Sequence, residues 1–543
     1  MQPAFSLIVA SILLTGVTLT RAVDAAVAAP FALRDQTPEC YSLPGEATGR
    51  IGLVEGGQGE MSGNLKAWRL ANANAVTSTR AGPRREGKAP LQIEYPQKYS
   101  IFQRTGNTGE IVIDGVFTGP PGPIEARFND GPWVLISEGS EPGKFTAALK
   151  GEVGRGTLEV RLRQSPEVTV SVPLVSIGDI FVVAGQSNAA GWADHAYEPL
   201  EGLPYELLLY KRNVSVAWEK LQHPASASGH GSPWPLTMSY LCKNHRVPIG
   251  LITTAIGGAW LKQWLKASGE HYPGMIATVR AATRGSMKVR ALLWFQGEAD
   301  CNPSQEYAGL SYAGDHDKYL AALRQFVADV HRDVKLDTVY VGLIGSVPHT
   351  VGTAVLSTRE NIYQIRRALQ DSWQDSEISP GPVVYDVALE SDTIHIHFNS
   401  PEEMLPLAKR WAAAISAVTY RSGVGRGPVL QKAELAADRQ SASFTFDKEL
   451  KISDFKGQAG TKAEGWSFER DKTTRTDDYI ASSRIKKNVV YLRFKAEVAK
   501  SLQASYGVDG DGAGKTIMRG STDLPVEPFY SIPVAVPTKD SQP

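Results

Sequence analysis

The stretch "FVVAGQSNAAGW", residues 181–192, joins a strand-like apolar run to an abrupt polar turn. The run ends at Gly185, and Gln186, Ser187 and Asn188 follow it. Such a run is typical of a strand that is buried on both faces of a sheet. Two interpretations of the serine are open: an ordinary turn residue, or a nucleophile that the strand presents at the edge of the sheet.

The chain around this stretch alternates between strand-like and helix-like segments. Apolar, β-branched runs such as "PIGLITTAIGG", "VRALLWFQGE", "DTVYVGLIGS" and "GPVVYDV" are separated by helical stretches such as "YLAALRQFVADVHRD". This alternation predicts an α/β domain over residues 176–420, with a parallel sheet covered by helices on both faces. Because ligands bind at the carboxyl ends of such strands, the polar residues that end each run are candidates for a site.

The regions that flank this domain have a different texture. Residues 29–175 contain short alternating segments between Gly and Pro turns, which predict a β-rich, sandwich-like region, and residues 421–543 indicate a second β-rich domain. Residues 1–28 combine an apolar stretch with small residues, which predicts a secretory signal peptide and a periplasmic or extracellular protein. An apolar first helix or a lipid-facing anchor is the alternative, although the apolar core is short for a membrane span of about 20 residues.

The composition limits the classes of binding partner that are expected. At about 100–200 residues per domain, 543 residues predict two to four domains. Lys plus Arg and Asp plus Glu both number 57, and no long basic run occurs, so nucleic acid and anionic membranes are not expected partners. Cys40, Cys242 and Cys301 are spaced too widely for a zinc motif, and one disulfide with one free thiol is an option. No metal or cofactor is expected.

Two further strand ends carry groups that a serine nucleophile needs. Gly257 and Gly258 close the run in "TTAIGGAWLKQW", where they suit either a tight turn or backbone N–H donors of an oxyanion hole. Gln296 ends the run in "LLWFQGEADCN", and its amide is a candidate for a further donor. Glu298 and Asp300 follow as candidate carboxylates at the rim of the site, supports of a catalytic histidine, or helix caps.

The stretch "ESDTIHIHFNSPEEM" supplies candidate bases for the serine. Asp392 and His395 lie three residues apart, so a turn can bring the carboxylate to the imidazole and fix the tautomer for base catalysis. His397 is the alternative base, with His395 then a packed or surface residue. The spacing to Asp392 favours His395.

Taken together, "GDIFVVAGQSNAAGW", "VPIGLITTAIGGAWLKQW", "LLWFQGEAD" and "DTIH" resemble the four blocks of the SGNH/GDSL hydrolase superfamily. The form that they resemble is that of sialate O-acetylesterases and related carbohydrate acetylesterases. The resemblance covers about residues 175–420, and four blocks in the same order make it specific. It implies a three-layer α/β/α hydrolase domain and a serine carboxylic-ester hydrolase that needs no metal.

The resemblance assigns roles position by position. It implies Ser187 as nucleophile, His395 as general base and Asp392 as the residue that orients the base. The oxyanion hole would combine the N–H groups of Ser187 and of Gly257 or Gly258 with the Gln296 amide. Four residues are candidates for contacting the substrate or supporting the site: Gln186, Asn188, Glu298 and His397. The segment "DHD" at residues 315–317 is interpreted as a solvated loop rather than a metal site.

The function implied by the resemblance is hydrolysis of O-acetyl esters on a carbohydrate through an acetyl-enzyme, as in sialate O-acetylesterases. Alternatives are an acetylxylan or other glycan acetylesterase on the same fold, a non-catalytic carbohydrate-binding protein, and a lipase or thioesterase. The expected partner is an acetylated carbohydrate, without membrane insertion after the signal peptide is removed. The identity of the sugar is left open.

Overall fold

The computed structural model describes residues 90–118, 120–139, 141–195, 197–225, 229–267, 269–304, 309–351, 354–389, 396–470, 473–475, 477–498, 502–508 and 517–536. The predicted signal peptide, the rest of the chain before residue 90, and the candidates Asp392 and His395 lie outside these residues. Among the described residues, no helix is long and apolar enough to cross a membrane.

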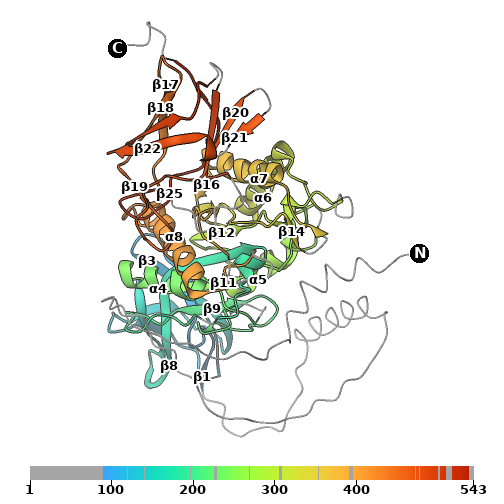
Figure 1. The fold of residues 1–543 in the computed structure, drawn as a ribbon. Coiled ribbons are helices and arrows are strands. Elements are labelled where there is room, and N and C mark those ends of the chain that lie inside the picture. Colours follow the sequence, from blue (N-terminus) through green and yellow to red (C-terminus); the bar gives the residue numbers. More distant parts are fainter. Residues whose placement is uncertain are drawn as a thin grey trace, which may run out of the picture. The chain divides into compact units, whose positions relative to one another are not determined.

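A long strand, β8 (Ser165–Gly185), connects two sheets. Its first part pairs antiparallel with β7 (Gly154–Leu162), whereas its last residues pair in parallel with β11 (Ile249–Thr253) and β12 (Ala291–Phe295). Figure 1 shows β8 passing from the β-hairpin that it forms with β7 into the middle of the parallel sheet. The strand therefore runs without a break through residue 175, where the sequence predicts a domain boundary.

The strands before β8 enclose an apolar core of their own. Strands β1 (Leu91–Tyr95), β3 (Thr108–Phe117) and β6 (Gly143–Glu152) form an antiparallel sheet, while β2 (Ile101–Gln103), β4 (Ile124–Phe128), β5 (Val134–Ser137) and β7 join the sheet of β8. Alternate residues of β3 and β7 are buried, as expected for strands with one face on a core. Ile111, Ile113, Leu158 and Val160 are among these core residues.

The central sheet has the strand order β10-β9-β11-β8-β12-β13-β16. Its remaining strands are β9 (Leu208–Lys211), β10 (Glu219–Lys220), β13 (Thr338–Val341) and β16 (Ile378–Pro380), and all neighbours from β9 to β16 pair in parallel. Ser187, Gly257 and Gln296 all follow the carboxyl ends of its strands. The predicted α/β class with a parallel sheet is confirmed.

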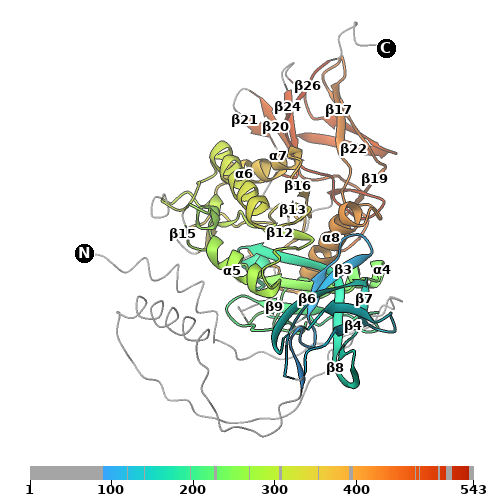
Figure 2. The same cartoon turned by 180° about the vertical axis from the view of Figure 1, so that it is seen from behind.

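Helices cover both faces of this sheet. Phe181 and Val183 of β8 pack with α4 (Trp234–His245) and α8 (Pro401–Thr419). Val182 and Ala184 belong to the core of the other face, with α5 (Tyr272–Ala282), α6 (His316–Asp333) and α7 (Arg359–Asp371). In Figures 1 and 2, α4 and α8 lie on the opposite side of the strands from α5, α6 and α7. Burial of both faces explains why these strands are apolar throughout.

Several short elements complete this part of the chain. They are α3 (Ser187–Ala190), the 3₁₀ turns at Leu261–Trp264, Ala299–Cys301 and Ser372–Gln374, and the hairpin β14 (Thr350–Val351) with β15 (Ala354–Val355). The start of α8 is fixed by a capping box, in which Glu403 N–H donates to Ser400 Oγ at 3.4 Å and Ser400 N–H donates to Glu403 Oε2 at 3.0 Å. The capping box sets where the preceding loop, which carries His397, ends.

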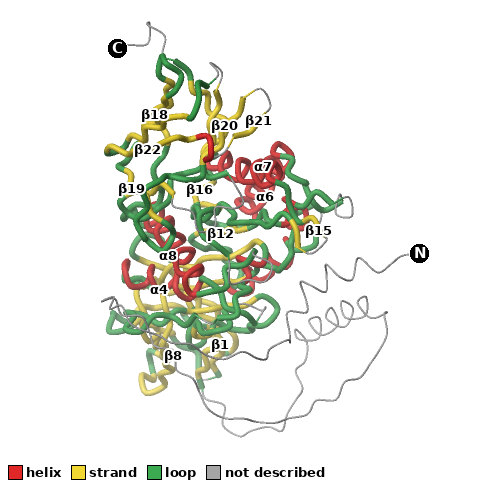
Figure 3. Tube along the Cα trace, in the orientation of Figure 1, coloured by secondary structure: helices red, strands yellow, loops and turns green. Residues whose placement is uncertain are grey.

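The C-terminal part consists mostly of strands, as the tube in Figure 3 shows. One sheet contains β17 (Leu430–Leu435), β18 (Ser441–Phe446), β23 (Val489–Phe494) and β22 (Ile480–Lys486), and another contains β21 (Thr473–Arg475), β20 (Trp466–Arg470), β24 (Leu502–Tyr506) and β26 (Phe529–Val534). A 3₁₀ turn at Asp477–Tyr479 precedes β22, and β19 (Leu450–Ser453) pairs with β25 (Ile517–Gly520).

A buried ion triad ties this part to the α/β domain. The Asp386 carboxylate accepts from Arg410 of α8 at 2.6 and 2.8 Å and from Arg519 of β25 at 2.5 Å, and Asp386 is fully buried. Burial acts to raise the pKa of Asp386, but the two guanidinium groups outweigh burial and hold the pKa below its usual value.

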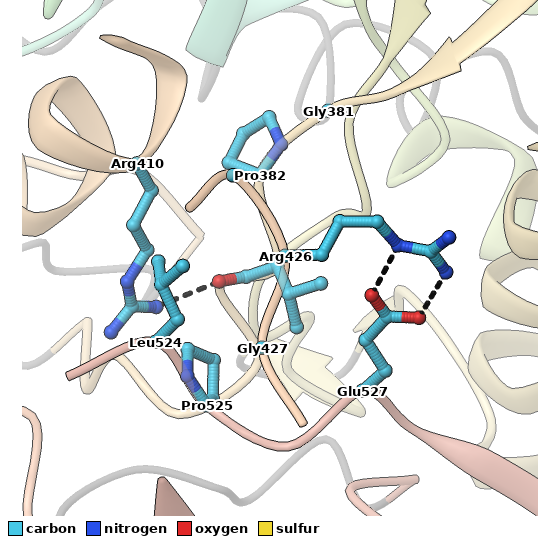
Figure 4. Close-up of a pocket in the computed structure, with 10 residues that line it drawn as sticks. Gly381, Pro382, Arg410, Arg426, Gly427, Leu524, Pro525 and Glu527 are labelled. Atoms are coloured by element: carbon cyan, nitrogen blue, oxygen red, sulfur yellow. Dashed lines mark hydrogen bonds and ion pairs between the residues drawn. The ribbon is translucent and has the colours of Figure 1, made fainter. Parts of the chain in front are cut away.

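Figure 4 shows a small pocket beside Arg410, in which Arg426 forms a two-point ion pair with Glu527.

Candidate active site

Ser187 begins the short helix α3 directly after β8. The turn before it depends on Gly185, whose φ is +132° and whose added Cβ would lie 2.1 Å from the carbonyl oxygen of Phe295 in β12. Only glycine combines this backbone conformation with so close an approach. The Gln186 N–H donates to the same Phe295 oxygen at 3.1 Å, so the turn is joined to the neighbouring strand. Ser187 is 3% exposed.

A histidine lies within hydrogen-bond distance of this serine. His397 Nε2 is 3.0 Å from Ser187 Oγ, and His397 is also 3% exposed. A hydroxyl in such contact with an imidazole can pass its proton to the ring as it becomes a nucleophile. The structure thus places the second histidine candidate of the sequence beside Ser187. The first candidate, His395, and its partner Asp392 lie outside the described residues.

The side chain of Asn188 bonds to the protein at both ends of its amide. Nδ2 donates to Glu298 Oε1 at 2.7 Å and to the Ile396 carbonyl oxygen at 3.0 Å. Oδ1 accepts from the Phe398 N–H at 3.3 Å. Asn188 therefore connects the turn after β12 to the backbone on either side of His397, which is a structural role.

Glu298 is a buried carboxyl group in this network. Its side chain is 2% exposed, and Oε2 has no hydrogen-bond partner in the part of the chain that the structure describes. Burial raises the pKa of Glu298, while the hydrogen bond from Asn188 and the nearby charge of His397 act in the opposite direction. Glu298 therefore does not lie at a solvated rim.

Gln186 also acts within the protein. Its Oε1 accepts from Gln296 Nε2 at 3.3 Å, from the Gly297 N–H at 3.3 Å and from the Ala299 N–H at 3.2 Å. The side chain that precedes the serine therefore holds the turn that follows β12.

Gln296 is fully buried and its amide is occupied by protein groups. Nε2 donates to Asp300 Oδ2 at 2.7 Å and lies 3.3 Å from the Ala259 carbonyl oxygen, while the Tyr319 hydroxyl donates to Oε1 at 2.9 Å. An amide nitrogen has two hydrogens to donate, and these contacts together with the one to Gln186 use both. The role of Gln296 as an oxyanion donor stays a prediction that these contacts do not support.

Asp300 organises the loops around Gln296. It accepts from the N–H groups of Leu261 and Tyr312, each at 3.0 Å, in addition to the Gln296 amide. Burial raises the pKa of Asp300 to about 6, against the effect of these hydrogen bonds. Asp300 is fully buried, so a position at the substrate rim is excluded.

The glycine pair lies in a loop that contacts the serine turn. The Ile256 N–H donates to the Gly185 carbonyl at 3.1 Å, which brings the loop after β11 to the serine turn. Gly258 has a φ of +69°, a conformation that favours glycine. Within the described residues, no acceptor is found for the N–H groups of Ser187, Gly257 or Gly258. Unpaired donors at this edge are what an oxyanion hole requires.

Trp192, which the sequence analysis did not single out, forms an aromatic wall beside the histidine. Its ring centroid lies 5.9 Å from that of His397 and 4.9 Å from that of His230. A Cβ added to Gly257 would come within 3.1 Å of Trp192 Cζ3. The half-buried Trp192 is the last residue of the stretch "FVVAGQSNAAGW". A large aromatic residue directly after a polar turn is the sequence feature that could have indicated its place beside the site.

The remaining candidates are structural. Cys242 and Cys301 are buried free thiols, and Cys301 Sγ donates to the Gly297 carbonyl. The segment "DHD" begins α6 instead of forming a loop, because Asp315 caps the helix by accepting from the Lys318 N–H at 3.1 Å. The loop prediction for this segment is wrong. In the parts of the chain that the structure describes, no group of three or more His, Cys, Asp or Glu side chains could hold a metal.

Comparisons with known proteins found similarity to carbohydrate esterases. Residues 177–416 match the family model described as carbohydrate esterase, sialic acid-specific acetylesterase. The predicted resemblance to carbohydrate esterases is confirmed. A probable carbohydrate esterase of Arabidopsis thaliana is 25% identical over 181 residues, which are 29% of this chain and 66% of that relative. The matched part thus spans slightly less than two thirds of the relative.

A solved structure shows that the fold is shared. A carbohydrate acetylesterase from Xanthomonas citri superposes with a TM-score of 0.55 at 17% identity, over 80% of this chain and 97% of that chain. The match of residues 177–416 to the esterase family model agrees with the predicted esterase activity.

Proposed function

We propose that this protein hydrolyses O-acetyl esters of a carbohydrate, with Ser187 as nucleophile and His397 as general base. The observation that carries the proposal is the 3.0 Å contact between Ser187 Oγ and His397 Nε2 at the carboxyl edge of a parallel sheet. The family match supports the acetylated carbohydrate as substrate. Sialate, xylan and other glycans are the candidate sugars.

In the first half of the reaction, Ser187 Oγ attacks the acetyl carbonyl carbon while His397 Nε2 takes the hydroxyl proton. The tetrahedral intermediate collapses when the bond between that carbon and the sugar oxygen breaks, and His397 gives the proton to the departing oxygen. In the second half, His397 removes a proton from water, and the water oxygen attacks the acetyl-enzyme. Acetate leaves and Ser187 regains its proton.

The developing oxyanion would be stabilised by the backbone. The N–H groups of Ser187 and of Gly257 or Gly258 are the proposed donors, because they have no acceptor within the described residues. A contribution from Gln296 would require its amide to leave the acceptors that it now has, of which Asp300 is the nearest at 2.7 Å. Losing one such donor costs about 10²–10³ in kcat in enzymes of this kind.

The remaining sequence-based assignments belong to the same proposal. Asp392 is proposed to orient the base, and His395 is the base only if His397 is not. An SGNH-type three-layer domain is supported by the helices on both faces of the sheet. Export through residues 1–28 is proposed from their apolar sequence, and N-terminal sequencing of the mature protein tests it.

Ester hydrolysis is tested with p-nitrophenyl acetate and a panel of acetylated glycans, read as acetate release. We expect wild type to be active and Ser187→Ala to fall to the background rate. Equal rates for the two would refute the proposal. A p-nitrophenyl ester series of increasing acyl length separates an acetylesterase from a lipase or thioesterase, since only the latter prefer long chains. Binding of acetylated glycan without release would indicate the non-catalytic alternative.

A further inference from the structure

The residue that follows the nucleophile contacts the backbone on both sides of the base. Asn188 Nδ2 donates to the Ile396 carbonyl oxygen at 3.0 Å, and Asn188 Oδ1 accepts from the Phe398 N–H at 3.3 Å. These two backbone groups flank His397. One amide therefore fixes the peptide segment that carries the imidazole.

This arrangement joins the nucleophile and the base through one short element. Ser187 and Asn188 are consecutive in α3, so a displacement of α3 moves both the hydroxyl and the contacts that hold the histidine segment. The side chains of Asn188 and His397 are 4% and 3% exposed, so solvent does not compete strongly for these bonds.

The orientation of the Asn188 amide is set by its three partners, of which Glu298 gives the shortest contact. An asparagine amide can bind with its oxygen and nitrogen exchanged unless a partner distinguishes them. The Ile396 carbonyl oxygen can only accept and the Phe398 N–H can only donate, while the nearest partner of Nδ2 is Glu298 Oε1 at 2.7 Å. With Nδ2 held there, Oδ1 is directed to the Phe398 N–H.

We propose that Asn188 and Glu298 are positioning residues of the esterase. Glu298 anchors the Asn188 amide through its shortest hydrogen bond, and Asn188 holds the backbone around His397 so that Nε2 faces Ser187 Oγ. This inference rests on the proposed role of His397 as base. The positioning role of Asn188 differs from a role in binding the sugar, because the three partners of its amide all belong to the protein.

Kinetics with p-nitrophenyl acetate test the proposal first. For Asn188→Ala we expect kcat to fall about 10²-fold with KM changed less than about twofold, since misplacing a catalytic group acts on the chemical step. Glu298→Ala should lose about 10-fold or more in kcat. Glu298→Gln keeps an oxygen that accepts from Asn188, so it should retain most of the activity. Equal losses in the two Glu298 variants would overturn the anchoring role.

A matched control separates this effect from general destabilisation. Asn488, in the turn between β22 and β23, donates from Nδ2 to the Phe446 carbonyl oxygen at 2.7 Å. Asn488→Ala removes an amide that bonds a backbone carbonyl far from the serine site, so its kcat should equal that of wild type. A loss in Asn488→Ala as large as in Asn188→Ala would overturn the proposal.

A structural readout does not depend on ester hydrolysis. In a crystal structure of Asn188→Ala, we expect His397 Nε2 to leave the 3.0 Å contact with Ser187 Oγ or to occupy several positions. An unchanged contact would overturn the positioning role, whether or not wild type is active. Inactive wild type together with a displaced His397 in the variant would refute the proposed function while supporting the positioning role.

Discussion

Ser187 Oγ and His397 Nε2 lie 3.0 Å apart although 210 positions separate the two residues in the chain. One residue follows the central strand β8, and the other lies in the loop that the capping box of α8 brings to an end. Their contact is therefore produced by the packing of α8 and β8 within one domain, since Phe181, Val183 and residues of α8 share a core.

His397→Ala is expected to lower kcat for p-nitrophenyl acetate by about 10³-fold or more, because Ser187 loses its proton acceptor. His395→Ala is the matched control and should keep activity close to wild type. Steady-state kinetics of both variants check the prediction. If His395→Ala is the inactive variant, the assignment of the base is wrong.

Gly185→Ala is expected to destabilise the protein by about 3 kcal/mol or more, since the new Cβ meets the Phe295 carbonyl oxygen at 2.1 Å in a left-handed backbone region. Gly202→Ala is a suitable control, because Gly202 has a φ of +66° and no atom within 4 Å of an added Cβ. That change should cost only about 1 kcal/mol. Urea unfolding of both variants measures the difference, and equal costs would contradict the steric argument.

Gln296→Ala is expected to lower the free energy of unfolding. The loss in kcat should be much smaller than the roughly 10²–10³-fold loss expected when an oxyanion donor is removed. The amide hydrogen-bonds Asp300 at 2.7 Å, so its removal leaves a buried carboxyl short of a donor. Chemical denaturation and p-nitrophenyl acetate kinetics on the same preparation check this. A loss of about 10²–10³ in kcat at unchanged stability would instead establish Gln296 as an oxyanion donor.

Asp386→Asn is expected to destabilise the protein by about 3–5 kcal/mol at neutral pH, because Arg410 and Arg519 would keep buried positive charges without their counter-ion. The pKa of Asp386 is lower in the folded protein than its ordinary value. Its ionisation therefore contributes stability above the unfolded pKa of about 3.9, and this contribution is lost as the pH falls below that value.

Urea unfolding of wild type and Asp386→Asn between pH 3 and pH 7 measures this contribution. The stability gap between the two proteins should be largest near pH 7 and should narrow toward pH 3. A gap that does not change with pH would show that the charge of Asp386 contributes nothing to folding.

The sequence was sufficient for features that depend on local pattern. Apolar β-branched runs between helical stretches predict the α/β class, because strands covered on both faces must be apolar over their whole length. The break at Gly185 places Ser187 at a strand end, and the order of four motifs is enough for the resemblance to carbohydrate esterases. Each of these conclusions needs only neighbouring residues or their order along the chain.

Only the tertiary structure could decide which groups meet. His395 and His397 differ by two positions, so spacing to Asp392 could not show which imidazole lies beside Ser187. Asn188 and Gln296 both follow strand ends, where residues that contact a substrate are expected. In the structure, however, the Asn188 amide bonds Glu298 and the Phe398 N–H, both more than 100 positions away. The Gln296 amide bonds Gln186 and Asp300. Strand β8 similarly pairs in two sheets. Local sequence sets the backbone at a strand end, whereas the partner of each side chain depends on how distant segments pack.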